Sequence, residues 1–314
     1  MLSFIVVGAG TVGSVLGALL QHAGHDVRYW VRAARRSSFN SLCVARRGGE
    51  QIQIPAPQLL CIGDAVPPSD WVLVCVRGEQ LTAALREVAL HMGAERRVAI
   101  AAITLEPVTK RARAVGLNGP IYALHVSFAA FNAGQPPGRV EWFPFALPTT
   151  VTPDGDATAK AASQQLARTL ARAGLPTRSA LRMHTLMGFV SALTTVLALT
   201  WDLCAWRITR LAKDEPLRQL TARAMREATG SVAPDSVLRY LPVWVFAAFL
   251  RVLPRFIGAR ARAGWVEHGP KIRAQTETLT LEMLNMLGPS QRGASALQAL
   301  FAKWQLAQRA PLSR

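Results

Sequence analysis

The chain has 314 residues, of which 50% are hydrophobic and 18% charged, so it is a folded, core-rich protein and not a disordered one. Its 36 Lys and Arg residues outnumber its 19 Asp and Glu residues, which gives a net charge of +17. Such a surface attracts the phosphates of a nucleotide cofactor, a nucleic acid or a membrane, although a generic arginine-rich surface has the same charge. Because no nucleic-acid-binding motif accompanies the charge, we expect no nucleic-acid partner.

The four cysteines, Cys43, Cys61, Cys75 and Cys204, are scattered without the spacing of metal ligands. We therefore expect free thiols, no bound metal and a cytoplasmic location, where thiols stay reduced. We expect no signal peptide, because the apolar start at residues 2–7 is short and no basic segment precedes it.

The N-terminal half alternates strand-like and helix-like segments. Apolar runs predict strands, and apolar residues at helical spacing predict helices between them. Buried strands joined by helices predict an α/β, Rossmann-type parallel sheet with helices on both faces. The expected strands are residues 4–7, 27–31, 71–76, 98–103 and 121–126, with short β-like runs within 42–60; the expected helices are 12–23, which Gly24 ends, and 80–92; residues 132–139 predict a turn.

The C-terminal half is predicted to be almost entirely helical. The change of pattern predicts a sheet-containing domain at residues 1–175 and an all-helical domain at residues 176–314. The expected helices are residues 156–173, which Gly174 ends, and then 181–208, 215–228, 243–256, 268–287 and 294–308.

Two segments of this half are strongly apolar. Residues 187–206 contain Asp202 and several hydroxyl side chains, so we interpret them as a helix buried between the domains. Residues 240–250 are too short to span a membrane and are followed by Arg251 and Arg255. They predict a core helix or an interfacial helix, and peripheral membrane contact is the lesser alternative.

Three glycines, Gly8, Gly10 and Gly13, form a G-x-G-x-x-G pattern between a predicted strand and a predicted helix. In dinucleotide-binding domains the first glycine permits a tight turn, the second lets the backbone approach a diphosphate, and the third lets the helix pack closely. Free N–H groups at the helix start then bind the phosphates. The expected nucleotide-binding residues are Gly8, Ala9, Gly10, Thr11, Val12 and Gly13. The alternative is a domain of this type that has lost its ligand.

The end of the second predicted strand selects the cofactor. NAD sites usually place Asp or Glu there, but this chain has Arg32 and no acid until Glu50. A guanidinium suits the 2′-phosphate of NADP, so we expect NADP(H), with Arg32 as the main contact. Arg35 and Arg36 either assist or belong to a solvated basic loop.

The stretch "VVGAGTVGSVLGALLQHAGHDVRYWVR" resembles the N-terminus of ketopantoate reductases (2-dehydropantoate 2-reductases), and so does "SDWVLVCVRGEQLTAAL". In the second stretch Arg77 stands at the usual lysine position, and Gln80 matches a glutamine of the family. The resemblance covers roughly the first 90 residues. It implies a Rossmann domain followed by a helical domain, and NADPH-dependent reduction of ketopantoate to pantoate, a step of pantothenate biosynthesis.

The catalytic residues that the resemblance implies are missing. The family's proton-donating lysine falls on Met183 or His184, and its two asparagines fall near Met187 or Gly188 and Ser191 or Ala192. The family's Asn-Gly after the fifth strand is replaced as well, with Thr104 or Leu105 in its place. His184 is the best replacement donor, because imidazole can be protonated near neutral pH. The alternative is an incidental helix histidine.

Two further positions belong to the candidate site. The family has a glutamate near the cofactor, which here is Glu277 or Glu282, and both also suit a solvent-exposed helix face. His125 ends a predicted strand, at the edge where Rossmann sites form, and a structural role is its alternative.

The first hypothesis is therefore an NADPH-dependent reductase acting on a small 2-keto acid or related carbonyl compound. The alternatives are an opine-type dehydrogenase, which forms a C–N bond, and a non-catalytic NADPH-binding protein. A homodimer is compatible with each hypothesis, since family members are often dimers or monomers.

Overall fold

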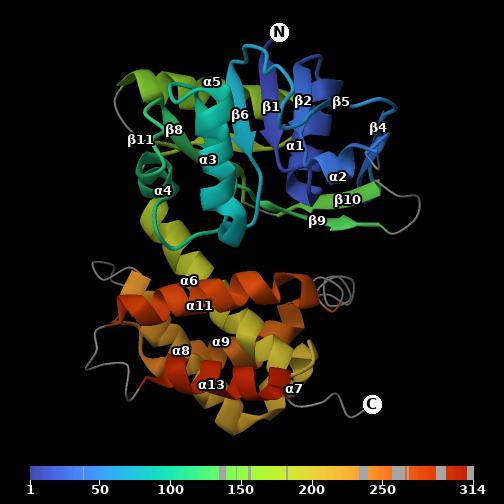
Figure 1. The fold of residues 1–314 in the computed structure, drawn as a ribbon. Helices are drawn as coiled ribbons and strands as arrows, with labels where there is room; N and C mark the ends of the chain where they lie inside the picture. The colour runs from blue at the N-terminus through green and yellow to red at the C-terminus, as the bar shows by residue number, and fades with distance from the viewer. Residues whose placement is uncertain are drawn as a thin grey trace. The chain divides into compact units, whose positions relative to one another are not determined.

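The computed structural model describes residues 1–37, 39–133, 139–145, 147–154, 157–181, 183–232, 240–256, 266, 269–287 and 295–309. The chain forms two compact units, Met1–Met183 and His184–Arg314 (Figure 1). The first unit extends past the boundary predicted at Leu175, because residues 177–179 form a strand that joins its sheet.

The first unit is built on an eight-stranded sheet. Its strands, in spatial order, are β12 (Thr177–Ser179), β11 (Thr149–Asp154), β8 (Ile121–His125), β7 (Val98–Ile100), β6 (Trp71–Val74), β1 (Ser3–Val7), β2 (Asp26–Trp30) and β5 (Gln58–Leu60). All neighbouring strands run parallel except β8 and β11. The predicted Rossmann-type α/β fold is confirmed, and the expectation of a wholly parallel sheet is wrong at that one junction.

Helices cover both faces of this sheet because the strand side chains alternate between two apolar cores. Phe4 and Val6 of β1 belong to a core shared with α1 (Thr11–His22) and α5 (Ala157–Arg172). Ile5 and Val7 belong to the opposite core, shared with α3 (Leu81–Met92) and α4 (Val108–Ala114). The short helix α2 (Ala33–Arg36) follows β2, and the 3-10 turn η1 (Gly78–Gln80) precedes α3.

A smaller, four-stranded sheet packs against α1 in the first core. Its strands, in order, are β4 (Gln51–Ile54), β3 (Leu42–Arg46), β10 (Arg139–Pro144) and β9 (Phe128–Asn132). The β-like runs predicted within residues 42–60 are present, whereas β9, β10 and β11 were not predicted. Residues 134–138 of the predicted turn lie outside the described residues.

The second unit is helical, as predicted. Its helices are α6 (His184–Leu203), α7 (Ile208–Lys213), α8 (Glu215–Val232), α9 (Val243–Phe256), α11 (Arg273–Met286) and α13 (Ala296–Arg309), with a 3-10 turn η3 (Gly269–Ile272) before α11. Among the helices that the structure describes here, α8 packs against α6, α7, α9, α11 and α13. The single helix predicted at residues 181–208 is wrong, because Ala205 and Trp206 have φ of 49° and 59° and separate α6 from α7.

The carboxylate of Asp202 fastens three helices of this unit. It is 3% exposed and accepts hydrogen bonds from the indole N–H groups of Trp206 and Trp304 at 3.0 and 2.9 Å. The guanidinium of Arg273 donates to both oxygens at 2.9 and 2.8 Å, and the Gln308 amide donates at 2.8 Å. The buried charge is therefore satisfied by donors from α11, α13 and the end of α6.

Residues 186–203 of α6 are long and apolar enough to cross a membrane by length and composition, and 56% of them are buried inside the structure. Their contacts with α8, α11 and α13 are those of a core helix of a helical unit.

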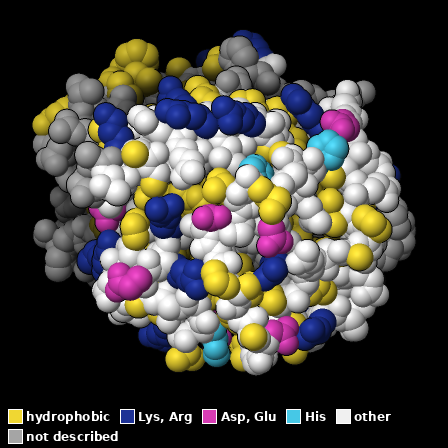
Figure 2. Space-filling view, turned by 90° about the horizontal axis from the view of Figure 1, so that it is seen from above, with side chains coloured by type: hydrophobic (Ala, Val, Ile, Leu, Met, Phe, Trp, Pro, Cys, Tyr) yellow, Lys and Arg dark blue, Asp and Glu magenta, His cyan; other side chains and the backbone are white. Residues whose placement is uncertain are grey.

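The basic charge is dispersed over the face drawn in Figure 2, where Lys and Arg side chains alternate with uncharged and acidic ones. On that face the net charge alone marks no binding site.

Candidate functional site

The turn between β1 and α1 requires its first glycine. Gly8 has φ of +93°, and a Cβ there would lie 2.5 Å from the carbonyl oxygen of Cys75. Both the backbone angle and the close approach to the end of β6 exclude a larger residue. Gly8 therefore shapes the turn, and its contact with a cofactor stays a prediction.

The other two glycines of the pattern differ from each other. A Cβ at Gly13 would lie 2.2 Å from the Gly8 carbonyl oxygen, so this glycine lets α1 pack closely on the turn. A Cβ at Gly10 would meet no atom within 4 Å. The space beside Gly10 is open, as expected where a backbone is left accessible to a bulky ligand.

The N-terminus of α1 is left without a cap. Gly10 is the N-cap residue, no side-chain hydrogen bond caps the helix, and its first turn contains no acidic residue. The N–H of Ser14 donates to the Gly10 carbonyl at 2.8 Å, so the ladder of helical hydrogen bonds starts there. The N–H groups before Ser14, together with the helix dipole, form a site suited to a phosphate group.

The three arginines after β2 have different surroundings. Arg35 donates to the Ala9 carbonyl at 3.1 Å and lies over the Phe39 ring, 5.7 Å from its centroid. Arg36 pairs with Asp64 at 3.1 Å. Arg32, the exposed N-cap residue of α2, has no side-chain hydrogen bond or ion pair with any described residue. Its guanidinium is thus available to an added phosphate.

Asp64 explains why Arg36 is engaged. The N–H of Cys61 donates to this carboxylate at 2.8 Å, and the Arg36 guanidinium donates to both of its oxygens. These two donors, the Cys61 N–H first, hold the pKa of Asp64 below its usual value. Arg36 is therefore partly neutralised by a carboxylate that stays ionised.

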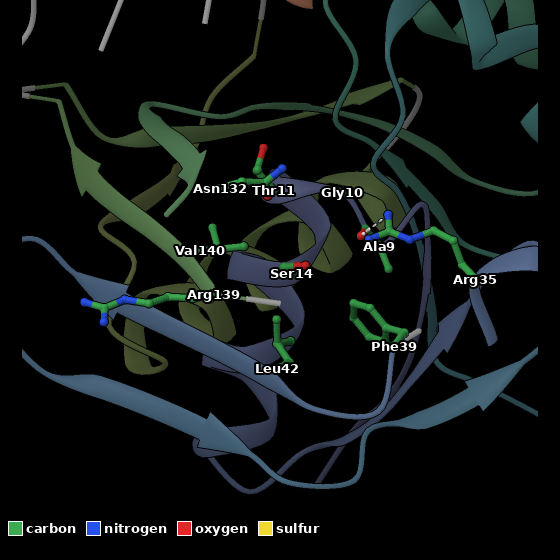
Figure 3. A pocket seen from close by; sticks show the side chains of 10 residues that line it. All are labelled: Ala9, Gly10, Thr11, Ser14, Arg35, Phe39, Leu42, Asn132, Arg139 and Val140. Carbon is green, nitrogen blue, oxygen red and sulfur yellow. Dashed lines mark hydrogen bonds between the residues drawn. The ribbon is translucent and has the colours of Figure 1, made fainter. Parts of the chain in front are cut away.

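A cavity of about 280 Å³ lies beside the glycine turn (Figure 3). Its apolar wall includes Phe39 and Leu42, the buried hydroxyl side chain of Ser14 faces it, and none of the described residues that line it is acidic. The other lining residues are Ala9, Gly10, Thr11, Arg35, Asn132, Arg139 and Val140. The guanidinium of Arg35 lies at the Ala9 carbonyl, whereas that of Arg139 points away from the cavity.

The predicted residues after β6 and β7 reach the same edge of the sheet. A Cβ at Gly78 would lie 2.6 Å from the Ile103 carbonyl oxygen, so the two loops touch. Arg77 is half-exposed and pairs with Glu79 at 3.0 Å, and Gln80 is half-buried at the end of η1. The Thr104 hydroxyl donates to the Glu106 carbonyl at 2.7 Å. Since β2, β1, β6 and β7 are adjacent and parallel, Arg32, the glycine turn, Arg77, Gln80 and Thr104 share one edge.

The start of α6 offers little polar chemistry. His184 begins this helix, and its side chain lies outside the described part of the structure. A Cβ at Gly188 would lie 2.7 Å from Val232 Cγ1, and Ala192 is fully buried, so neither of these alternatives offers a polar side chain. Of the other two alternatives, Met187 is half-buried and apolar, and Ser191 carries a hydroxyl and is 8% exposed. Leu186 and Val190 are exposed on the same helix.

The remaining candidates, Glu277, Glu282 and His125, belong to elements other than the β1–α1 turn. Glu282 and Glu277 are half-buried on α11 of the second unit. His125 is half-buried at the end of β8, where it pairs with Thr150 of β11. The structure describes each unit separately, so Glu282 stays a prediction.

Sequence reasoning missed the cavity residues Ser14, Phe39, Asn132 and Arg139. The hydroxyl of Ser14 could be found from its place one residue after the glycine pattern. Asn132 and Arg139 reach the cavity through the small sheet, and its non-local pairing of β3 with β10 leaves no signal in a single sequence.

A family model described as ketopantoate reductase PanE/ApbA matches residues 4–146. The predicted resemblance to the ketopantoate reductases is therefore confirmed over these residues. A sequence comparison with curated proteins finds no match.

Solved structures share the fold along nearly the whole chain. A PanE/ApbA family ketopantoate reductase from Ralstonia eutropha JMP134 is 19% identical, with a TM-score of 0.70 over 96% of this chain and 97% of that one. A 2-dehydropantoate 2-reductase from Geobacter metallireducens GS-15 is 18% identical, with a TM-score of 0.67 over 97% and 99%. D-mandelate dehydrogenase in complex with NADH is 16% identical, with a TM-score of 0.71 over 98% of each chain.

Proposed function

Residues 4–146 belong to the ketopantoate reductase family, and from this premise we propose that the protein is an NADPH-dependent reductase of a small 2-keto acid. The observation that carries the proposal is the uncapped N-terminus of α1 beside the open space at Gly10. A Rossmann turn of this form binds a dinucleotide, of which the nicotinamide cofactors are one class. The NADH complex of the structurally similar D-mandelate dehydrogenase supports this cofactor class.

The residues present fit a dinucleotide. The amides of Thr11 and Val12 would hold its diphosphate, and the open side of Gly10 leaves room for it. Arg32 would bind the 2′-phosphate, because it is the arginine after β2 whose guanidinium no described residue engages. Arg77, Gln80 and Thr104 lie at the same edge and would line the cofactor groove.

When bound, the reduced cofactor supplies a hydride to the keto carbon, and the resulting alkoxide needs a proton. His184 is the donor that we propose, because a histidine can hold that proton near neutral pH. Among the α6 positions matched to the family's asparagines, Gly188 and Ala192 carry no polar side chain, and Ser191 offers a hydroxyl that is 8% exposed.

The absence of the family's lysine and asparagines from these positions also favours a second function, a protein that binds NADPH without turnover. In that case the glycine turn and Arg32 are used, and no donor is required. The opine-type alternative differs only in the need for an amine as second substrate.

Fluorescence titration tests the cofactor assignment. We expect NADPH to bind more tightly than NADH, and Arg32→Gln to weaken NADPH binding by about 10- to 100-fold, the value of one or two charge-assisted hydrogen bonds, with little change for NADH. Arg36→Gln is the matched control, since Asp64 already engages that guanidinium. Equal affinities for the two cofactors would contradict the assignment.

Oxidation of NADPH by a panel of 2-keto acids, with and without amines, then separates the three functions. Turnover without amine supports the reductase, and His184→Gln should then lower kcat and remove an ionisation near pH 6–7 from its pH profile. The exposed His22→Gln is the control. Silence across the panel with cofactor binding intact supports the non-catalytic function.

A further inference from the structure

Helix α9 (Val243–Phe256) has an exposed face that carries large aromatic side chains. Trp244 is 70% exposed, Phe249 is 42% exposed, and Tyr240 just before the helix is 67% exposed. The opposite side of the helix is buried through Phe246 and Leu250. The helix is thus held in the second unit by one side while aromatic rings on the other side meet solvent.

The same face carries arginines. Arg251 and Arg255 are exposed and stand seven and eleven residues after Trp244, which places all three on one stripe of the helix. Within the helix itself, residues 243–256 contain Arg251 and Arg255 and no acidic residue. The stripe therefore combines the Trp244 ring with positive charge and has no acidic residue of its own helix beside it. Phe249 lies about 140° around the helix from Trp244, at the other margin of the exposed face.

We propose that this face, from Tyr240 to Arg255, binds the surface of an anionic phospholipid bilayer. Tryptophan and tyrosine rings are stable at the level of the lipid headgroups, where their apolar bodies are buried and their polar groups stay hydrated. Arginines on the same stripe would pair with the lipid phosphates. The helix would lie in the interface and would not cross the bilayer, since its 14 residues are too few to span it.

Charge complementarity favours a bilayer over a second copy of the chain. A symmetric contact between two copies would place the same acid-free, arginine-bearing stripe against itself, and like charges facing each other oppose such a contact. The net charge of +17 adds long-range attraction to an anionic surface. This surface is independent of the proposed reductase activity and could hold the enzyme beside its membrane whether or not it turns over.

Cosedimentation of the full chain with vesicles tests the proposal. We expect binding to vesicles of phosphatidylcholine with 30% phosphatidylglycerol, little binding to pure phosphatidylcholine, and loss of binding in high salt, where charges are screened. Trp244→Ser with Phe249→Ser should weaken binding about 10-fold, and Arg251→Gln with Arg255→Gln about 30-fold. Leu306→Ser, which removes a 67% exposed apolar side chain of α13, should leave it unchanged.

Circular dichroism of each variant establishes that it is folded. Brominated lipids give a second readout: in wild type they should quench part of the tryptophan fluorescence, and Trp244→Phe should lose that part while still binding. The proposal is overturned if anionic vesicles are not bound, or if the aromatic pair can be replaced without effect. It is equally overturned if sedimentation shows that the Trp244 face instead mediates a dimer or binds only acidic polypeptides such as polyglutamate.

Discussion

The N-termini of α1 and α13 differ in what satisfies their first N–H groups. At α13 the carboxylate of Glu227, on α8, accepts the N–H groups of Ala296 and Leu297 at 2.9 Å each and the Ser295 hydroxyl at 2.7 Å. At α1 the N-cap is Gly10, and no side chain caps the helix. Both helices start with the same requirement for hydrogen-bond acceptors, and only the second finds them within the protein.

This difference separates structure from function. A carboxylate at α13 complements the helix dipole permanently and ties α8 to α13. At α1 the equivalent acceptor must come from outside, and the diphosphate of a dinucleotide is an acceptor of suitable charge. We therefore interpret the α13 end as a structural joint and the α1 end as a binding site.

The largest effect on stability is expected from Gly8→Ala, and Gly10→Ala in the same turn is compared with it. Gly8→Ala should lower the free energy of unfolding by about 4 kcal/mol, because it combines a positive φ with a clash against the Cys75 carbonyl. Gly10→Ala should change stability by less than about 0.5 kcal/mol, since its Cβ meets nothing, yet should weaken NADPH binding about 10-fold or more. Urea unfolding and NADPH titration measure both.

The two variants are a matched pair, since each adds one methyl group to the same turn at positions two residues apart. If Gly10→Ala unfolds the protein, or leaves NADPH affinity intact, the open space at Gly10 is not a ligand site.

A smaller effect is expected at the other helix. Glu227→Ala should lower stability by about 3 kcal/mol, because it removes the acceptor of three hydrogen bonds at the start of α13, and should leave NADPH affinity unchanged. Glu215→Ala, which removes an exposed carboxylate of α8, should cost less than about 1 kcal/mol. A loss of cofactor affinity in the Glu227 variant would contradict a purely structural joint.

The smallest effect on stability is expected at Asp70, whose carboxylate is hydrogen-bonded to Ser3 at the start of β1. The Ser3 N–H, and next its hydroxyl, donate to Asp70 at 2.8 Å and hold the pKa of this carboxyl below its usual value. The stabilisation is present above about pH 4 and is lost as the pH falls through the folded-state pKa.

Asp70→Asn should therefore lower stability at pH 7 by less than about 1 kcal/mol and flatten its decline below about pH 4. Chemical denaturation at several pH values measures this. If the stability of Asp70→Asn falls below about pH 4 as steeply as that of the wild type, Asp70 does not stabilise this end of the sheet.

Much of the first unit can be predicted from local sequence signals. Buried strands, the glycine turn and the terminating Gly24 and Gly174, whose φ are +84° and +92°, each follow from a few neighbouring residues. The small sheet cannot be predicted in this way, because β3 and β10 are separated by almost a hundred residues and pair through tertiary contacts. The break after α6 depends on the left-handed backbone of Ala205 and Trp206, for which non-glycine residues give no signal.

The site shows the same division. Arg32 stands out by its place at the end of a strand, but the engagement of Arg35 with the Ala9 carbonyl and of Arg36 with Asp64 requires the folded chain. Likewise, Met187 or Gly188 matches a family position in sequence, and only the folded chain shows that Gly188 packs closely against Val232.

A crystal structure of the chain with NADPH tests the central claim most directly. We expect diphosphate oxygens about 2.9 Å from the N–H groups of Thr11 and Val12, with the 2′-phosphate at the Arg32 guanidinium. A cofactor bound elsewhere, or a glycine turn whose N–H groups face water in the complex, would contradict it.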